Sequence, residues 1–159
     1  MSATSTVGVG DELPTAGRLI AIDLGEVRIG VAVSDPGQVV ASPAETLHVP
    51  RDQDRPTVDA LADAAERHEA VGIVLGYPRR LDGREGAAAQ RAQRFATLLR
   101  TRTGRPVRLV DERFTTVEAE RVLLDADVSR DGRKAAVDRV AASVLLQTVL
   151  DSQRRLRSE

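Results

Sequence analysis

The sequence predicts an α/β domain built on one mixed, five-stranded sheet with helices on both faces. Short apolar runs that end at turn residues indicate buried strands, whereas longer segments repeat their apolar residues at helical spacing. Three strands come first and helices then alternate with strands, in the order β-β-β-α-β-α-β-α-α. The domain is expected over 18–151, between a disordered tail over 1–17 and a polar, frayed tail over 152–159.

The predicted strands lie at 18–23, 29–33, 38–42, 71–75 and 107–110. The first three form a meander, because Gly25 can adopt positive φ and the Asp35-Pro36-Gly37 sequence favours a turn. The run over 71–75 is continuously apolar, which is typical of a strand buried on both faces.

Four helices are predicted, beginning near residues 55, 86, 115 and 135. Proline at position 56 suits the first turn of the first helix. Thr115 and Glu118 have the spacing of a capping box and open the third helix. The last helix, over 135–150, is the most apolar, and the polar segment before it, 125–134, is expected to be a loop.

Composition excludes several classes of protein. The 159 residues include no cysteine, which excludes disulfides and thiolate chemistry and suits the cytoplasm. His48 and His68 are twenty residues apart without a metal-binding pattern, so zinc is not expected. No segment has the length of a membrane span, and the first 17 residues lack the features of a signal peptide.

The net charge is −1, so a nucleic-acid partner would have to be bound by a local basic surface. Lys134 is the only lysine, and every other basic side chain except histidine is arginine. Codon bias is the simplest explanation, although arginine also suits phosphate contacts. Tyr77, Phe95 and Phe114 are the only aromatic residues. We therefore expect recognition of shape and phosphates rather than base stacking.

Three acids occupy unusual places. Asp23 ends an apolar strand at its carboxyl edge, where α/β sheets tend to bind ligands, although it could simply cap its own turn. Glu112 follows a later strand and would reach the same edge if the strands are parallel; otherwise it could form a surface ion pair with Arg113. Asp138 lies within the apolar last helix, where a buried carboxylate requires a metal ion or a partner such as Arg28.

Carboxylates gathered around one point suit Mg²⁺ or Mn²⁺, which prefer oxygen ligands. Two such ions about 4 Å apart can activate water and stabilise the leaving oxygen in phosphodiester cleavage. Together, Asp23, Glu112 and Asp138 are candidate catalytic metal ligands, while the turn cap, the surface ion pair and the arginine partner stay open as alternatives.

Four ordered sequence blocks resemble the YqgF family, also called RuvX, of Holliday junction resolvase-like proteins and pre-16S rRNA nucleases. The blocks lie at 22–35, 76–86, 111–119 and 137–147. The resemblance runs from about residue 18 to residue 150 and implies an RNase H-like fold. It also implies that Asp23, Glu112 and Asp138 are the acidic triad of a metal-dependent nuclease.

The resemblance places Arg28 and Arg113 beside the triad, as substrate contacts or as partners of the acids. Arg79 and Arg80 depart from the family pattern, which has an apolar residue and then asparagine there, but they add positive charge that suits phosphate binding. The segment 127–134 matches nothing strongly, and its basic residues could touch substrate or simply be solvated.

The implied substrate is structured RNA, in maturation of the 5′ end of 16S rRNA on pre-ribosomal particles, with branched DNA as the alternative. An RNase could act as a monomer, whereas a resolvase that cuts two strands would need a homodimer. Two other classes stay open: a non-catalytic nucleic-acid or ribosome-binding module, and part of an actin-like ATPase, whose phosphate loop Asp23-Leu24-Gly25 also resembles.

Overall fold

The computed structural model describes residues 8–77, 86–112 and 130–158, without the side chains of 130–136. Six strands and three helices lie in these ranges. They are β1 (Val9–Gly10), β2 (Leu19–Asp23), β3 (Arg28–Ser34), β4 (Ala41–His48), α1 (Asp54–Arg67), β5 (Gly72–Tyr77), α2 (Ala87–Thr103), β6 (Val107–Asp111) and α4 (Arg130–Ser158). The helix predicted over 115–124 lies outside the described residues. None of the described helices has the length and hydropathy of a membrane span.

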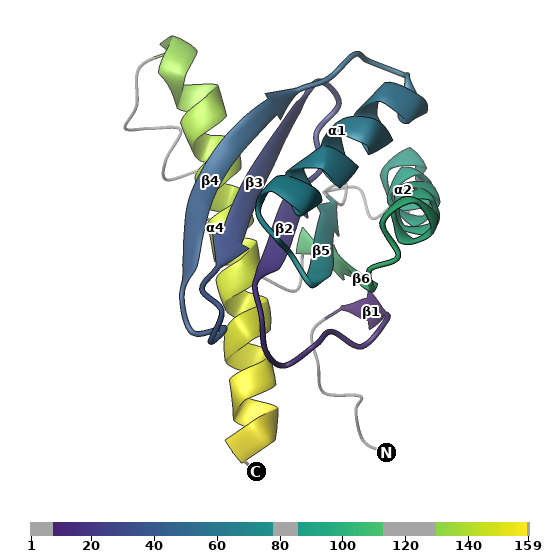
Figure 1. Cartoon of the computed structure of the whole chain (residues 1–159). Helices are drawn as coiled ribbons and strands as arrows, with labels where there is room; N and C mark the ends of the chain where they lie inside the picture. The colour runs from purple at the N-terminus through teal and green to yellow at the C-terminus, as the bar shows by residue number, and fades with distance from the viewer. Residues whose placement is uncertain (1–7, 78–85, 113–129, 159) are drawn as a thin grey trace.

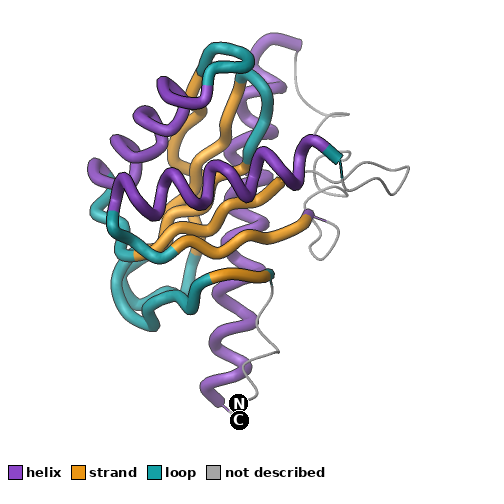
Figure 2. The backbone as a smooth tube through the Cα atoms, turned by 90° about the vertical axis from the view of Figure 1, so that its right-hand side faces the viewer, coloured by secondary structure: helices purple, strands orange, loops and turns teal. Residues whose placement is uncertain are grey.

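All six strands belong to one mixed sheet with the order β1-β6-β5-β2-β3-β4. The strands β2, β5 and β6 are parallel, and β2, β3 and β4 form the predicted antiparallel meander. The helices α1 and α2 cover one face and α4 crosses the other (Figures 1 and 2). The prediction of a mixed sheet between helices on both faces is confirmed.

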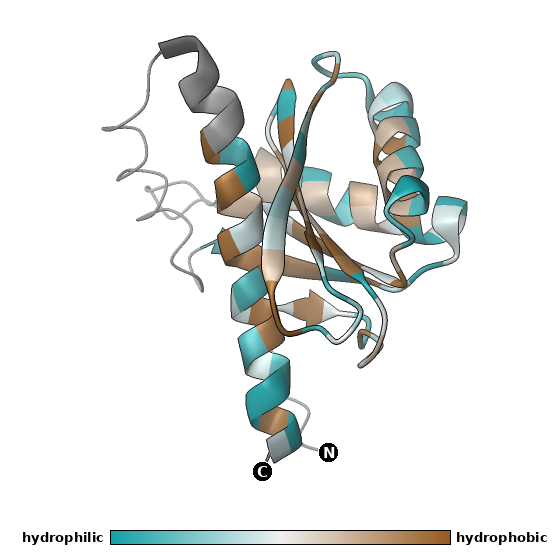
Figure 3. Ribbon diagram, turned by 60° about the vertical axis from the view of Figure 1, so that its left-hand side comes forward, coloured by the Kyte–Doolittle hydropathy of each residue, from teal (hydrophilic) through white to brown (hydrophobic). Residues whose placement is uncertain are grey.

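Two apolar cores lie on the two faces of the sheet. Ile20 and Ile22 face α1 and α2, where Phe95 is fully buried, whereas Leu19 and Ala21 face α4. This division follows from the alternation of side chains along β2. Apolar segments accordingly run along the strands between the helical layers (Figure 3).

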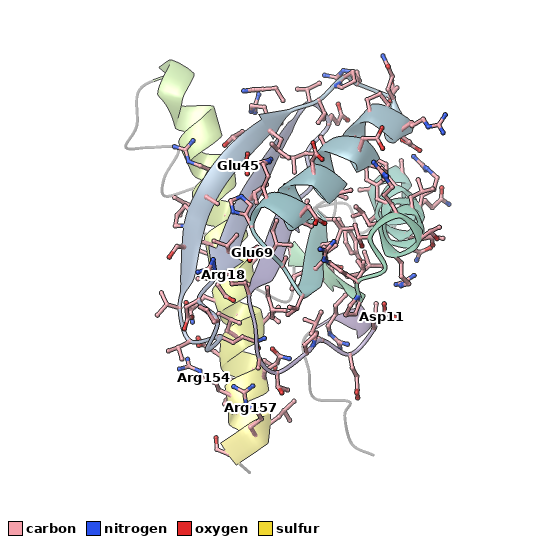
Figure 4. All side chains as sticks on the ribbon, viewed as in Figure 1. Asp11, Arg18, Glu45, Glu69, Arg154 and Arg157 are labelled. Carbon is pink, nitrogen blue, oxygen red and sulfur yellow. The ribbon has the colours of Figure 1, made fainter. Side chains whose placement is uncertain are left out.

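The prediction of a disordered tail over 1–17 is wrong for residues 8–17. β1 pairs antiparallel with β6, so the sheet has six strands rather than five. Arg108 of β6 is 8% exposed, and its guanidinium donates to the carbonyl oxygens of Gly8 at 2.7 Å and Asp11 at 3.2 Å. A guanidinium buried in a strand requires acceptors, and the segment before β2 supplies them. Figure 4 shows Asp11 beside β1.

The third strand spans 41–48 rather than 38–42, because residues 35–40 form a tight turn. The Asp35 carboxylate accepts hydrogen bonds from the N–H groups of Val39 and Val40, both at 2.8 Å. Gln38 has φ of 58° and is fully buried, with its amide donating to the carbonyl of Pro14. These side-chain contacts compete with strand pairing, so β4 begins at Ala41 rather than at residue 38.

The last helix is longer than the predicted 135–150 and includes most of the expected polar tail. It begins at residue 130 and continues to Ser158. Ser152 and Gln153 are buried, and the Arg157 guanidinium donates to the Thr15 carbonyl at 3.4 Å. The end of α4 is therefore stabilised by the segment before β2, a contact that the local sequence does not reveal.

Candidate active site

The carboxyl ends of three parallel strands meet at one edge of the sheet, and two of the predicted acids lie there. Asp23 ends β2 and is the register partner of Gly76 on β5. Glu112 directly follows Asp111, whose register partner on β5 is Tyr77. Asp23 and Glu112 therefore lie at the same edge of the sheet, with β5 between their strands. Carboxyl edges of this kind are where α/β sheets bind ligands.

Both acids belong to the side of the sheet that α4 covers. Ala21 precedes Asp23 by two residues and Val110 precedes Glu112 by two, and both pack in the core beneath α4. Side chains alternate along a strand, so Asp23 lies on that side, and Glu112 continues the alternation one residue past β6. Their exposed fractions are only 3% and 2%. Two carboxylates are thus buried on one side of one edge.

The third acid, Asp138, is brought to this edge by close packing of α4 over glycines. Gly30 is the register partner of Asp23, and a Cβ atom there would lie 1.9 Å from the Asp138 carbonyl oxygen. On the other side of Asp23, a Cβ atom at Gly76 would lie 2.3 Å from Leu145 Cδ2. Asp23 therefore has glycine as its register partner on both adjacent strands, which lets the helix approach the sheet this closely.

The Asp138 carboxylate forms an ion pair with the first residue of β3. Arg28 Nε donates to Asp138 Oδ2 at 3.1 Å. The two side chains are 35% and 16% exposed, so the pair is partly accessible to solvent. The arginine partner left open as an alternative for Asp138 is therefore present.

The donor chemistry of this edge fits a hard divalent cation. Asp23, Glu112 and Asp138 offer carboxylate oxygens, which Mg²⁺ and Mn²⁺ prefer, and the first two are already buried on one side. Within the described ranges, however, no three acidic or histidine side chains gather closely enough to hold a metal ion as placed. The Asp138 carboxylate instead contacts Arg28.

Arg91 of α2, which sequence reasoning missed, supports the turn that follows Asp23. Its Nη1 donates to the Gly25 carbonyl at 2.7 Å, and its guanidinium lies 4.8 Å from the centre of the Phe95 ring. Burial lowers the pKa of the Arg91 guanidinium from its ordinary value. The sequence could have indicated this role. Arg91 precedes Phe95 by four residues and so lies on the same helix face, and a charged group on a buried face requires a hydrogen-bond acceptor.

The remaining predicted substrate contacts, Arg79, Arg80 and Arg113, lie outside the described residues, as do the side chains of 127–134. Arg28 is the predicted basic contact that the structure describes, and it lies beside Asp138 as expected. Arg154 and Arg157 lie at the carboxyl end of α4 (Figure 4). They follow Asp138 by 16 and 19 residues on the same helix.

Comparisons with known proteins find similar sequences over most of the chain. The RuvX family model, described as "Holliday junction resolvase", matches residues 17–152. A protein of Rhodococcus opacus named "Putative pre-16S rRNA nuclease" is 46% identical over 153 residues, which are 93% of this chain and 84% of that protein. A protein of the same name from Ligilactobacillus salivarius is 38% identical over 144 residues, covering 90% and 98% of the two chains.

Among solved structures, T. thermophilus RuvC in complex with a Holliday junction substrate matches with a TM-score of 0.53 and 13% sequence identity. The match covers 86% of this chain and 95% of that chain. At this identity the likeness concerns the fold, and it supports the RNase H-like architecture.

Proposed function

Because the chain belongs to the RuvX family, we propose that it is a nuclease that hydrolyses phosphodiester bonds at the edge formed by Asp23, Glu112 and Asp138. The observation that carries the proposal is the burial of Asp23 and Glu112 on one side of one sheet edge. Buried carboxylates are costly unless cations or hydrogen bonds compensate, so such a pair is typical of a functional site. The names of the relatives support pre-16S rRNA as the substrate. We further propose that the chain acts in ribosome assembly in the cytoplasm.

Mg²⁺ or Mn²⁺ is the proposed cofactor. Asp23 and Glu112 would hold it together with Asp138, whose Oδ2 Arg28 contacts. When bound, a divalent ion supplies an acidified water and stabilises charge on the leaving oxygen.

The other roles belong to the protein. α4 covers Asp23 and Glu112 and so limits the access of bulk water to them. Arg28 uses Nε to hold Asp138, and its remaining guanidinium N–H groups can donate to a phosphate oxygen. Arg91 keeps the turn after Asp23 in place through the Gly25 carbonyl.

Asp23→Asn tests the proposal, because it removes the charge at nearly constant shape. Purified protein is incubated with a 16S rRNA 5′-leader transcript in Mn²⁺ and, separately, in Mg²⁺. Cleavage should disappear in Asp23→Asn and persist in Asp63→Asn, a matched change at an exposed acid of α1. Equal cleavage by Asp23→Asn and wild-type protein would rule out the assigned role.

The description of the family favours branched DNA as the second candidate substrate. A four-way DNA junction is therefore included in the same assay. Cleavage of the junction alone would assign a resolvase activity, whereas binding of either substrate without cleavage would favour a non-catalytic module.

A further inference from the structure

His48, the last residue of β4, lies beside Arg28 across the ladder between β3 and β4. The register pairs these two residues, and the Val49 N–H donates to the Val27 carbonyl at 2.9 Å. Because this hydrogen bond joins Val27 and Val49, the residues next to the pair, Arg28 and His48 are opposite each other without exchanging backbone hydrogen bonds. The Cα atoms of such a pair are about 4.5 Å apart. Paired residues project from the same side of a sheet, so His48 lies on the side where Arg28 meets Asp138.

The two histidines of the chain differ in their surroundings. His68 Nε2 lies 2.6 Å from Glu45 Oε2, and Arg67 donates to the same oxygen at 2.8 Å; Figure 4 shows Glu45 on β4. His48 is exposed, and in the part of the chain that the structure describes its ring has no hydrogen bond or ion pair. The fold therefore employs His68 as a structural contact and leaves His48 available to a ligand.

The N–H donors around His48 suit an anionic ligand. Arg28 is 35% exposed and engages Asp138 through Nε, with its other nitrogens directed away from that bond. Glu26, in the turn before β3, is paired with Arg51, which follows β4. Each acid is paired with one of the two arginines, so the charge here is balanced. What this end of β3 and β4 offers a phosphate is N–H donors, from the guanidinium nitrogens outside the ion pairs and from the imidazole.

We propose that His48 and Arg28 together bind a backbone phosphate of the nucleic-acid strand, on the β4 side of the acidic site. The proposal rests on the proposed nuclease function and adds the direction from which the strand reaches the acids. An imidazole N–H and a guanidinium N–H can donate to the two free oxygens of one phosphodiester. Contacts of this kind position a strand without reading its sequence, in keeping with the three aromatic residues of the chain.

Binding is measured in the Asp23→Asn background, so that cleavage does not interfere, by fluorescence anisotropy with the 16S rRNA 5′-leader transcript. His48→Ala should raise Kd about three- to tenfold, as expected for the loss of one hydrogen bond. His48→Lys keeps a donor and a positive charge and should restore binding. Ser42→Ala, an exposed change at the opposite end of β4, is the matched control and should bind like the parent protein. In cleavage-competent protein, His48→Ala should raise KM more than it lowers kcat.

Equal Kd values for His48→Ala and Ser42→Ala would overturn the proposal, as would His48→Lys binding as weakly as His48→Ala. The two proposals fail separately. Wild-type protein that binds RNA through His48 but does not cut it contradicts the nuclease function alone. Cleavage that requires Asp23, with an unchanged Kd in His48→Ala, contradicts the phosphate contact alone.

Discussion

Gly30→Ala is expected to separate α4 from the sheet beside Asp23. A Cβ atom at position 30 would lie 1.9 Å from the Asp138 carbonyl oxygen, 2.3 Å from its carbonyl carbon and 3.0 Å from Arg139 N. All three atoms belong to the helix backbone, so no side-chain rotation can relieve the overlap. An ordinary contact begins at 3.4 Å, and the two elements must therefore separate by about 1.5 Å (3.4 − 1.9).

Overpacking of a core costs about 1–3 kcal/mol, and a clash between two backbones belongs at the upper end. We expect Gly30→Ala to lower the free energy of unfolding by about 3 kcal/mol, or the Tm by about 6–12 °C for a domain of this size. The same separation moves Asp138 relative to Asp23. A displacement of about 1 Å at a catalytic group can reduce the rate about a hundredfold.

Urea unfolding followed by circular dichroism measures the first effect, and cleavage of the leader transcript by the folded protein measures the second. Two further variants provide a graded comparison. A Cβ atom at Gly76 meets the flexible Leu145 side chain at 2.3 Å, and one at Gly86 meets nothing within 4 Å. Destabilisation should decrease from Gly30→Ala to Gly76→Ala to Gly86→Ala. If Gly30→Ala unfolded at the same urea concentration as the wild-type protein, the close packing of α4 on β3 would be refuted.

Two further changes test contacts outside the triad. Arg91→Met removes the donor to the Gly25 carbonyl and should lower kcat roughly tenfold, as expected for one charge-assisted hydrogen bond; an equal effect of Arg94→Met, its neighbour on α2, would contradict this role. The pKa of Asp11 is lowered below its ordinary 3.8 by the Val107 N–H and by an arginine. Its stabilisation is therefore present above pH 3.8 and lost as the pH falls through the lower folded value. Asp11→Asn should unfold more easily than wild type at pH 7, with a gap that closes in acid; a gap independent of pH would exclude the carboxylate as its source.

The position of Asp23 could be predicted because it depends on local pattern and on general rules of topology. An apolar run that ends in an acid places that acid at a strand end, and parallel connections bring the later strands to the same edge. The same rules place Glu112. The ion pair between Arg28 and Asp138 could be foreseen only as an alternative, because it joins residues 110 positions apart.

The sequence-based predictions are wrong where contacts between residues far apart in the chain override the local preference for secondary structure. The first 17 residues, rich in Ser, Thr and Gly, have little tendency to form structure by themselves, but the buried Arg108 binds the carbonyl groups of Gly8 and Asp11. A charged residue in the middle of an otherwise apolar strand was the available signal. Residues 38–40 have the composition of a strand, yet the Asp35 carboxylate and the buried Gln38 amide hold them in a turn.

The length of α4 gives residues far from the acids an influence on them. Asp138 and Arg157 are 19 residues apart on one continuous helix, or about 29 Å at 1.5 Å per residue. If a helix of that length tilts as a rigid body, a rotation of about 2° about one end displaces the other end by about 1 Å. We therefore expect the contact of Arg157 with Thr15, and the burial of Ser152 and Gln153, to influence the alignment of Asp138. Under the proposed nuclease function, changes at either terminus of the domain should then alter cleavage without touching the acidic edge.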